Sequence, residues 1–182
     1  MARIEPKWSY GHLRELPDDG NRYEIGSGEL LVTPAPGTRH QAIVGNLFDL
    51  LRRAALHGHG KVFVAPVDVV FSPHDVLEPD LVFVSSGNLP IVKEPNIEGA
   101  PDLVVEVLSA STRERDLSAK LHIYSRYGVR YYWAVDPKEE CVHLYERVND
   151  ALVERPALRQ GDTLASPLFP DVSGSVVDVF KQ

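Results

Sequence analysis

Two apolar runs in the middle of the chain dominate its hydrophobic pattern, and each is associated with one carboxylate. Leu103 to Leu108 is apolar and largely β-branched except for Glu106, and Leu81 to Val84 is a second run that follows Asp80. Continuous apolar runs of this length are typical of strands that are buried on both faces of a sheet. We therefore expect two central strands, with Glu106 inside one and Asp80 at the start of the other.

Two longer segments have the period of amphipathic helices, one from Thr38 to about residue 57 and one over most of residues 113–127. Lys120 lies inside the apolar arc of the second helix, so we expect its ammonium to meet an anion. An ion pair with Asp116, four residues earlier, is the better explanation when this position is taken alone. The core-facing stripe predicted for the first helix is Ile43, Val44, Leu47, Leu50, Leu51 and Ala54.

Shorter patterns predict the remaining strands, and strands that precede and follow helices predict a mixed sheet. The fold class is therefore α/β (α+β): a mixed β-sheet flanked by helices, with an N-terminal β-hairpin, in a single domain over residues 1–182. The remaining strands are expected at residues 22–33 (a hairpin that turns at Gly26 to Gly28), 61–71, 130–135, 141–147, 152–155 and 175–180.

The composition, with 43% hydrophobic and 25% charged residues, is ordinary for a globular protein, and no apolar run reaches the roughly 18 residues of a membrane span. The single Cys141 excludes an intramolecular disulfide and favours a reducing cytoplasm. The formal net charge of −7 counts against tight binding of nucleic acid, which needs local Lys and Arg. Candidates for a local basic rim are Arg39, Arg52, Arg53, Lys61, Arg113, Arg115 and Arg126.

A carboxylate inside a buried strand is costly unless a metal, a cation or hydrogen bonds hold it. Pro-Asp-Leu-Val occurs at residues 79–82 and 101–104, so Asp80 and Asp102 are both candidate partners of Glu106. Asp102 lies roughly 13 Å from Glu106 along one strand, whereas ligands of one hard cation lie about 2–2.5 Å from it. Asp80 is the better partner. A turn residue at Asp80 and a strand-edge ion pair at Glu106 remain the alternatives.

An ordered set of short motifs surrounds Asp80, Glu106 and Lys120. They are Tyr23-Glu24-Ile25, Gly28-Glu29-Leu30, His40-Gln41, Pro79 to Val82, Pro101 to Ser109, Asp116 with Lys120, Tyr124, Gly128-Val129, Tyr132-Trp133 and Asp136-Pro137. With these motifs the chain resembles the PD-(D/E)XK nuclease superfamily, and more closely the bacterial Uma-two family of restriction-endonuclease-like proteins, over roughly residues 8–180. Leu108 stands where the superfamily's Glu-x-Lys places its lysine, and Lys120 of the following helix takes that position in the family's pattern.

The resemblance implies a restriction-endonuclease-like fold and metal-dependent hydrolysis of DNA phosphodiester bonds. It implies that Asp80, Glu106 and the backbone carbonyl of Val107 bind Mg²⁺ or Mn²⁺, and that Lys120 orients the attacking water or stabilises the pentacovalent phosphate. The family also suggests that one of two hairpin acids, Glu24 or Glu29, supports the site. Nucleic acid, expected to be DNA, is the implied partner, and a homodimer is plausible because many nucleases of this fold pair to cut two strands.

Other polar residues have ordinary explanations beside functional ones. His40 is an accessory candidate for the site or a capping residue, and Asp68 lines the same cleft or faces water. His57 and His59 lack a third ligand at typical spacing, so a charge–dipole role at a helix end is favoured over metal binding. The main rival to the enzyme is an inactive nuclease-like scaffold for binding or assembly, which the net charge and the missing Glu-x-Lys favour.

Overall fold

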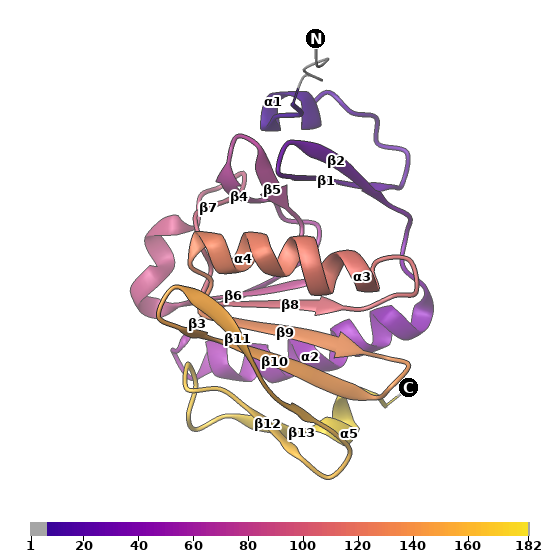
Figure 1. Ribbon diagram of the computed structural model, residues 1–182. Coiled ribbons are helices and arrows are strands. Elements are labelled where there is room, and N and C mark those ends of the chain that lie inside the picture. Colours follow the sequence, from indigo (N-terminus) through magenta and orange to yellow (C-terminus); the bar gives the residue numbers. More distant parts are fainter. Residues whose placement is uncertain (1–6, 182) are drawn as a thin grey trace.

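The computed structural model describes residues 7–181, which form two main sheets with helices around them (Figure 1). The larger sheet has one parallel pair, β8 with β9, and is otherwise antiparallel. The predicted α/β class and mixed sheet are thus confirmed. In spatial order its strands are β11 (Ala151–Leu158), β10 (Cys141–Val148), β9 (Tyr131–Asp136), β8 (Leu103–Val107), β6 (Leu81–Ser85) and β3 (Gly60–Val64).

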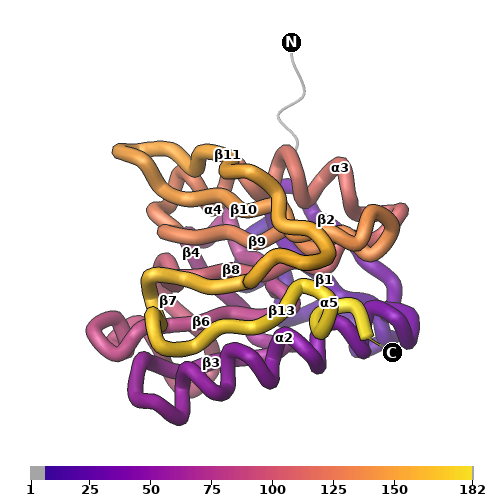
Figure 2. The backbone as a smooth tube through the Cα atoms, turned by 90° about the horizontal axis from the view of Figure 1, so that it is seen from below, coloured from indigo at the N-terminus to yellow at the C-terminus, as the bar shows by residue number. Residues whose placement is uncertain are grey.

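The second sheet contains the predicted N-terminal hairpin, in which Glu24 pairs with Leu31. A short helix, α1 (Tyr10–Leu13), precedes the hairpin, and a two-stranded sheet of β12 (Thr163–Ala165) and β13 (Ser173–Ser175) lies beside α2 near the C-terminus (Figure 2). The order of the second sheet is β2 (Glu29–Thr33), β1 (Arg22–Gly26), β5 (Asp75–Leu77), β4 (Val69–Ser72) and β7 (Ile97–Glu98).

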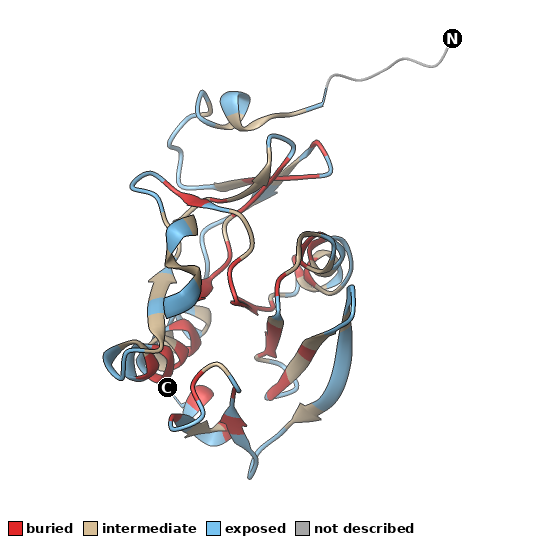
Figure 3. Ribbon diagram, turned by 90° about the vertical axis from the view of Figure 1, so that its left-hand side faces the viewer, coloured by how far each residue is buried: buried red, intermediate tan, exposed pale blue. Residues whose placement is uncertain are grey.

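Helices cover both faces of the larger sheet. On one face lies α2 (Thr38–Leu56), whose predicted stripe is buried at all six positions. On the other lies a continuous helical segment made of α3 (Arg113–Arg115), a π-helical turn (Asp116–Lys120) and α4 (Leu121–Tyr127), which ends at Gly128 as predicted, with φ 94°. Both helices carry buried residues on their inner sides and exposed residues outside (Figure 3).

The central strands alternate between these two cores. Phe83 and Val105 pack with α2, whereas Val104 packs with Ile123 and Tyr124 of α4. Side chains two residues apart share a face of a strand. Glu106 therefore points to the same side as Val104, toward the helix that carries Lys120. Within residues 7–181, no helix combines the length and the apolar character needed to cross a bilayer.

The strand predicted over residues 61–71 is wrong, because it is two strands in two sheets. β3 ends at Val64, and β4 begins at Val69. Pro66 lies between them and has no N–H to donate, so the ladder cannot continue through it. The break carries the chain from the larger sheet to the smaller one.

The last strand, predicted over residues 175–180, is also wrong. β13 ends at Ser175, and Val176–Val179 forms the short helix α5. The hydroxyl of Ser175 accepts a hydrogen bond from the N–H of Val177, which caps this helix. Val176 and Val179 are buried while Val177 is exposed, a three-residue spacing that fits one helical face rather than a strand.

Candidate active site

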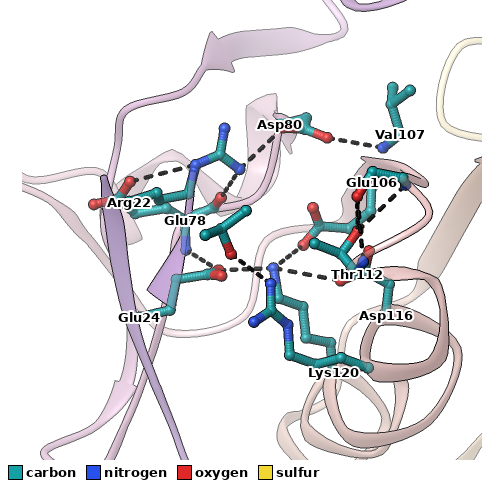
Figure 4. A network of polar contacts seen from close by, with 12 residues as sticks. Arg22, Glu24, Glu78, Asp80, Glu106, Val107, Thr112, Asp116 and Lys120 are labelled. Carbon is teal, nitrogen blue, oxygen red and sulfur yellow. Dashed lines mark hydrogen bonds and ion pairs between the residues drawn. The ribbon is translucent and has the colours of Figure 1, made fainter. Parts of the chain in front are cut away.

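Four buried carboxylates and one buried lysine meet between the hairpin, the central strands and the helical segment (Figure 4). Glu24 comes from β1, Asp80 precedes β6, Glu106 lies in β8, and Asp116 and Lys120 come from the π-helical turn. Lys120 Nζ lies 2.8 Å from Glu24 Oε1, 2.9 Å from Glu106 Oε1 and 3.7 Å from Asp116 Oδ1. The ammonium therefore joins β1 and β8 to the π-helical turn.

The register of two antiparallel strands brings Asp80 beside Glu106. Leu81 pairs with Val105, so the residues just outside this pair, Asp80 and Glu106, are adjacent and on the same face. The N–H of Val107 donates to Asp80 Oδ2 over 2.8 Å, which fixes the orientation of this carboxylate.

Two cationic or polar side chains hold Asp80 from the other side. Arg22 Nη1 lies 3.0 Å from Asp80 Oδ1 and also donates to the carbonyl of Glu78, and His40 Nε2 lies 3.1 Å from Asp80 Oδ2. Burial opposes ionisation of Asp80, but the hydrogen bond to His40 and the charge of Arg22 lower the pKa of this carboxyl. Asp80 is therefore a carboxylate at neutral pH.

Glu106 has the opposite electrostatic environment. Its burial, with Asp116, Asp80 and Glu24 nearby, raises its pKa to about 8, although Lys120 opposes the shift. Burial disfavours the charge of Lys120, yet the surrounding Glu106, Glu24 and Asp116 raise its pKa well above the usual range. Lys120 thus keeps its proton, and Glu106 is the carboxyl of the cluster that retains a proton up to about pH 8.

The cluster forms the floor of a pocket of about 140 Å³. The rim includes Thr33, Ser109 and Arg115, and wider hollows of about 400 Å³ and 380 Å³ adjoin it on two sides. His40 lines all three, and Asp80 lines the pocket and the first hollow. The pocket and the two hollows share lining residues, and together they are called the groove.

Six of the residues predicted for the site come together, and two do not. Asp80, Glu106, Lys120, Glu24 and His40 line the pocket, as does Val107. Glu29 is exposed at the turn end of the hairpin, where it pairs with Gly26 of β1. Gly26 lies beside the side chain of Ile123, not beside Lys120. Asp68 is half-buried and accepts a hydrogen bond of 2.9 Å from Tyr10, outside the pocket lining.

Two further residues of the site, Arg22 and Tyr124, were not assigned a role from the sequence. Arg22 stands two residues before Glu24, so the two-residue period of a strand places both on one face and was an available signal. Tyr124, four residues after Lys120, donates a hydrogen bond of 2.6 Å to Glu106. Asp116 joins the cluster as a fourth acid, and its predicted ion pair with Lys120 is present at 3.7 Å, within a π-helical turn that the sequence does not predict. Such turns inside helices are frequent at functional sites.

Among residues 7–181, two groups of three potential ligands lie close enough together to hold a metal, and neither is this cluster. They are His57 with His59 and Asp171, and Asp136 with Cys141 and His143. In the acidic cluster, Arg22 contacts Asp80, and Lys120 contacts Glu24 and Glu106.

Comparison with known families identifies the chain. Residues 11–178 match the family model described as "Uma2: Putative restriction endonuclease". The chain belongs to the Uma2 family. The family predicted from the sequence motifs is thus confirmed, and the match spans every residue of the candidate site.

A solved structure agrees with this fold. A crystal structure described as "a putative nuclease belonging to DUF820 from Anabaena variabilis ATCC 29413" matches this Uma2 chain with a TM-score of 0.78 and 19% identity, covering 94% of this chain and 97% of that chain. The type IIG restriction endonuclease BpuSI matches with a TM-score of 0.42 and 18% identity, over 78% of this chain and 15% of that one. No curated protein matches significantly.

Proposed function

We propose that this Uma2 protein is a Mg²⁺- or Mn²⁺-dependent endonuclease that hydrolyses DNA phosphodiester bonds. The observation that carries the proposal is the arrangement of Asp80 and Glu106, adjacent on neighbouring strands and facing Lys120 at the floor of an open pocket. Family membership supports the reaction class. The metal, the substrate and the roles of the residues are the proposal.

The residues of the pocket fit a divalent cation. Four buried carboxylates face the single buried ammonium of Lys120, and Arg22 and Arg115 at the edges leave an excess of negative charge. Glu24 Oε2 and Asp116 Oδ1 are buried without a hydrogen-bond partner. Unpaired buried acceptors are costly, and a bound cation would satisfy this demand. The raised pKa of Glu106 also indicates that the cluster lacks positive charge, because the proton that Glu106 retains compensates for a missing cation.

Asp80, Glu106 and the carbonyl of Val107 would hold the ion, since oxygen ligands of this kind suit Mg²⁺ and Mn²⁺. When bound, the ion would supply Lewis-acid chemistry, making water a better nucleophile and offsetting charge on the phosphodiester. Arg22 and Lys120 contact these two acids and would supply positive charge beside a substrate phosphate in the pocket.

Lys120 would act as a hydrogen-bond donor and a fixed positive charge. Because Glu106, Glu24 and Asp116 keep it protonated, it is unsuited to remove a proton from water. Its ammonium can instead orient the attacking water and stabilise the charge that develops on the phosphate oxygens. Glu24 would position Lys120, with which it forms the shortest ion pair of this ammonium.

The groove around the pocket supports a nucleic-acid partner. Three of the arginines predicted for a basic rim gather there: Arg115 at the pocket, and Arg39 and Arg113 at the adjoining hollow, which also includes Lys138. Phosphate contacts need this kind of local basic surface, whatever the net charge of the chain. A homodimer that cuts both strands of a duplex remains part of the proposal, as do a single domain and a reducing cytoplasmic location.

A second candidate is the inactive scaffold. Arg22 and His40 already contact Asp80, and Lys120 already contacts Glu106, so both proposed ligands have protein partners. On this alternative the cluster is a structural ion-pair network and binds no divalent ion.

Calorimetric titration of Mn²⁺ into the protein distinguishes the endonuclease from the inactive scaffold. The endonuclease proposal expects binding to the wild type that is lost in Asp80→Asn/Glu106→Gln, together with Mn²⁺-dependent nicking of plasmid DNA that is lost in Lys120→Ala. Glu24→Gln and Glu29→Gln form a matched pair on one hairpin, and only the first should reduce nicking. Equal Mn²⁺ binding by the wild type and the double variant would refute the site assignment, and no binding even with DNA present would favour the scaffold.

A further inference from the structure

Two histidines and one aspartate meet on the surface at the far end of α2 from the acidic pocket. His57 Nδ1 lies 2.8 Å from Asp171 Oδ2, and His59 Nε2 contacts Asp171 Oδ1. The third ligand that the local sequence lacks is thus supplied from 112 to 114 residues away. Figures 1 and 2 both show the loop between β12 and β13 beside the C-terminal end of α2.

The backbone holds the two histidines rigidly. His57 ends α2, and the N–H groups of Gly58 and His59 donate to the carbonyls of Ala55 and Ala54, the pattern of a Schellman cap. The carbonyl of His59 accepts a hydrogen bond from the N–H of Ser86. Both imidazoles therefore project from a fixed turn rather than from a free loop.

The loop that carries Asp171 is anchored as well. Phe169, two residues earlier, is fully buried and packs edge-on against Phe83 and Trp133. Arg53 of α2 donates a hydrogen bond of 3.1 Å to the carbonyl of Ser173. Since both sides of the cluster are fixed by the core, little conformational entropy would be lost on binding an ion.

We propose that His57, His59 and Asp171 form a site for a first-row transition metal of the Zn²⁺ type. Two imidazole nitrogens and one carboxylate are a ligand set that suits Zn²⁺ and its neighbours, not Mg²⁺. The ligand atoms all lie within 4.8 Å of one another, so small side-chain shifts would admit an ion between them. His57 and Asp171 are each 53% exposed and His59 is 25% exposed, so water can reach the ion and complete its coordination.

The hydrogen bonds of the aspartate distinguish this site from the second group of potential ligands, Asp136, Cys141 and His143. There, Asp136 already accepts hydrogen bonds from Arg113 and from the backbone N–H groups of Lys138 and Glu139. Asp171 has no partner among residues 7–181 other than the two histidines. A metal at this place would clamp the segment that leads to β13 against the end of α2, and it would be independent of the proposed nuclease reaction.

The test is a titration of Zn²⁺ into the full-length protein, followed by calorimetry and by thermal unfolding. We expect one equivalent to bind and to raise the unfolding temperature. His57→Ala, His59→Ala and Asp171→Asn should each weaken binding by at least about tenfold. His122→Ala, at an exposed histidine outside both ligand groups, should bind like the wild type.

The acidic pocket is the control that keeps the two metal proposals apart. Asp80→Asn/Glu106→Gln should retain the Zn²⁺ equivalent. The proposal is overturned if the wild type does not bind Zn²⁺, if the histidine and Asp171 variants bind it as tightly as the wild type, or if the pocket variant loses it. Circular dichroism of each variant without metal verifies that these surface substitutions leave the fold intact.

Discussion

Lys120 donates a hydrogen bond of 2.9 Å to Glu106, and neither side chain is more than 3% exposed. The bond connects the helical segment to the central strand β8, and Glu24 brings the hairpin to the same ammonium. Charges that are buried to this extent are stabilised by each other and not by hydration. The loss of one partner leaves an uncompensated charge, which costs more than the pair contributes when intact.

Lys120→Met should destabilise the metal-free protein by about 3–5 kcal/mol, because three buried carboxylates lose their common cation. Urea unfolding in the presence of a chelator at pH 8.5, where Glu106 is mostly ionised, measures this cost. The double variant Lys120→Met/Glu106→Gln should be less destabilised than the sum of the two single variants, because the glutamine removes one of the orphaned charges. Additive costs would show that the two side chains do not interact energetically.

Stability should fall as the pH rises toward 8. The pKa of Glu106 is raised to about 8 and that of Glu78 to about 7, both mainly by burial, from an ordinary value of 4.5. The folded state therefore binds more protons than the unfolded state between pH 4.5 and these values. The contribution of each group is complete below about pH 4.5 and is lost as the pH rises through its folded-state pKa, at up to about 1.4 kcal/mol per pH unit.

Glu106→Gln should flatten this dependence up to about pH 8, whereas Glu78→Gln should flatten it only up to about pH 7. Unfolding free energies from urea titrations at several pH values between 5 and 8.5, without metal, provide the measurement. Saturating Mn²⁺ should also reduce the slope of the wild type, because a cation would replace the proton on Glu106. An unchanged slope in Glu106→Gln would mean that this carboxyl is already ionised at pH 6.

The fold was largely predictable from the sequence because its signals are local. The apolar runs at residues 81–84 and 103–107, the stripe of α2 and the cap at Gly128 each depend on neighbouring residues, and each is confirmed. The two wrong strand predictions, at residues 61–71 and 175–180, lie where tertiary contacts determine the secondary structure. Pro66 divides a run that looks continuous, and Ser175 begins a helix whose four residues carry too little pattern to be distinguished from a strand.

The candidate site was predictable in part for the same reason. Asp80, Glu106 and Lys120 are charged residues at positions where the pattern of their own elements predicts burial, so the sequence identifies them as candidates. The choice between Glu24 and Glu29 required the position of the hairpin over the helix, and the third ligand beside His57 and His59 lies more than 100 residues away. Long-range proximity of this kind has no local signature, so the sequence alone favoured a charge–dipole role for the two histidines.

Tyr124→Phe should destabilise the protein by about 1.5–3 kcal/mol, because Tyr124 donates to Glu106, and hydrogen bonds to charged groups are stronger than neutral ones. Tyr132→Phe is the matched control. Tyr132 is equally buried, but it donates to the backbone carbonyl of Asp116 over 3.2 Å, so its loss should cost only about 0.5–1.5 kcal/mol. Urea unfolding at pH 8.5, where Glu106 is mostly ionised, gives both values, and equal costs would contradict the ionic character of the Glu106 contact.

Gly60→Ala should be far more damaging than Gly58→Ala, although the two glycines flank the same histidine. A Cβ at Gly60 would lie 2.1 Å from the carbonyl oxygen of Val84, so β3 must move away from β6. At Gly58, with φ 85°, the space is open and only the cost of a left-handed residue, roughly 1–2 kcal/mol, applies. Overpacking should add about 1–3 kcal/mol or more at Gly60.

The same pair of variants also tests how Zn²⁺ affinity depends on the backbone. Gly60→Ala should weaken Zn²⁺ binding because it displaces His59 from Asp171, whereas Gly58→Ala, if it keeps the helix cap, should bind with nearly wild-type affinity. Urea unfolding and Zn²⁺ calorimetry on both proteins supply the comparison. A Gly60→Ala protein as stable as Gly58→Ala would show that β3 and β6 tolerate a side chain at this contact. The rigid placement of His59 would then need another cause than the close approach of these strands.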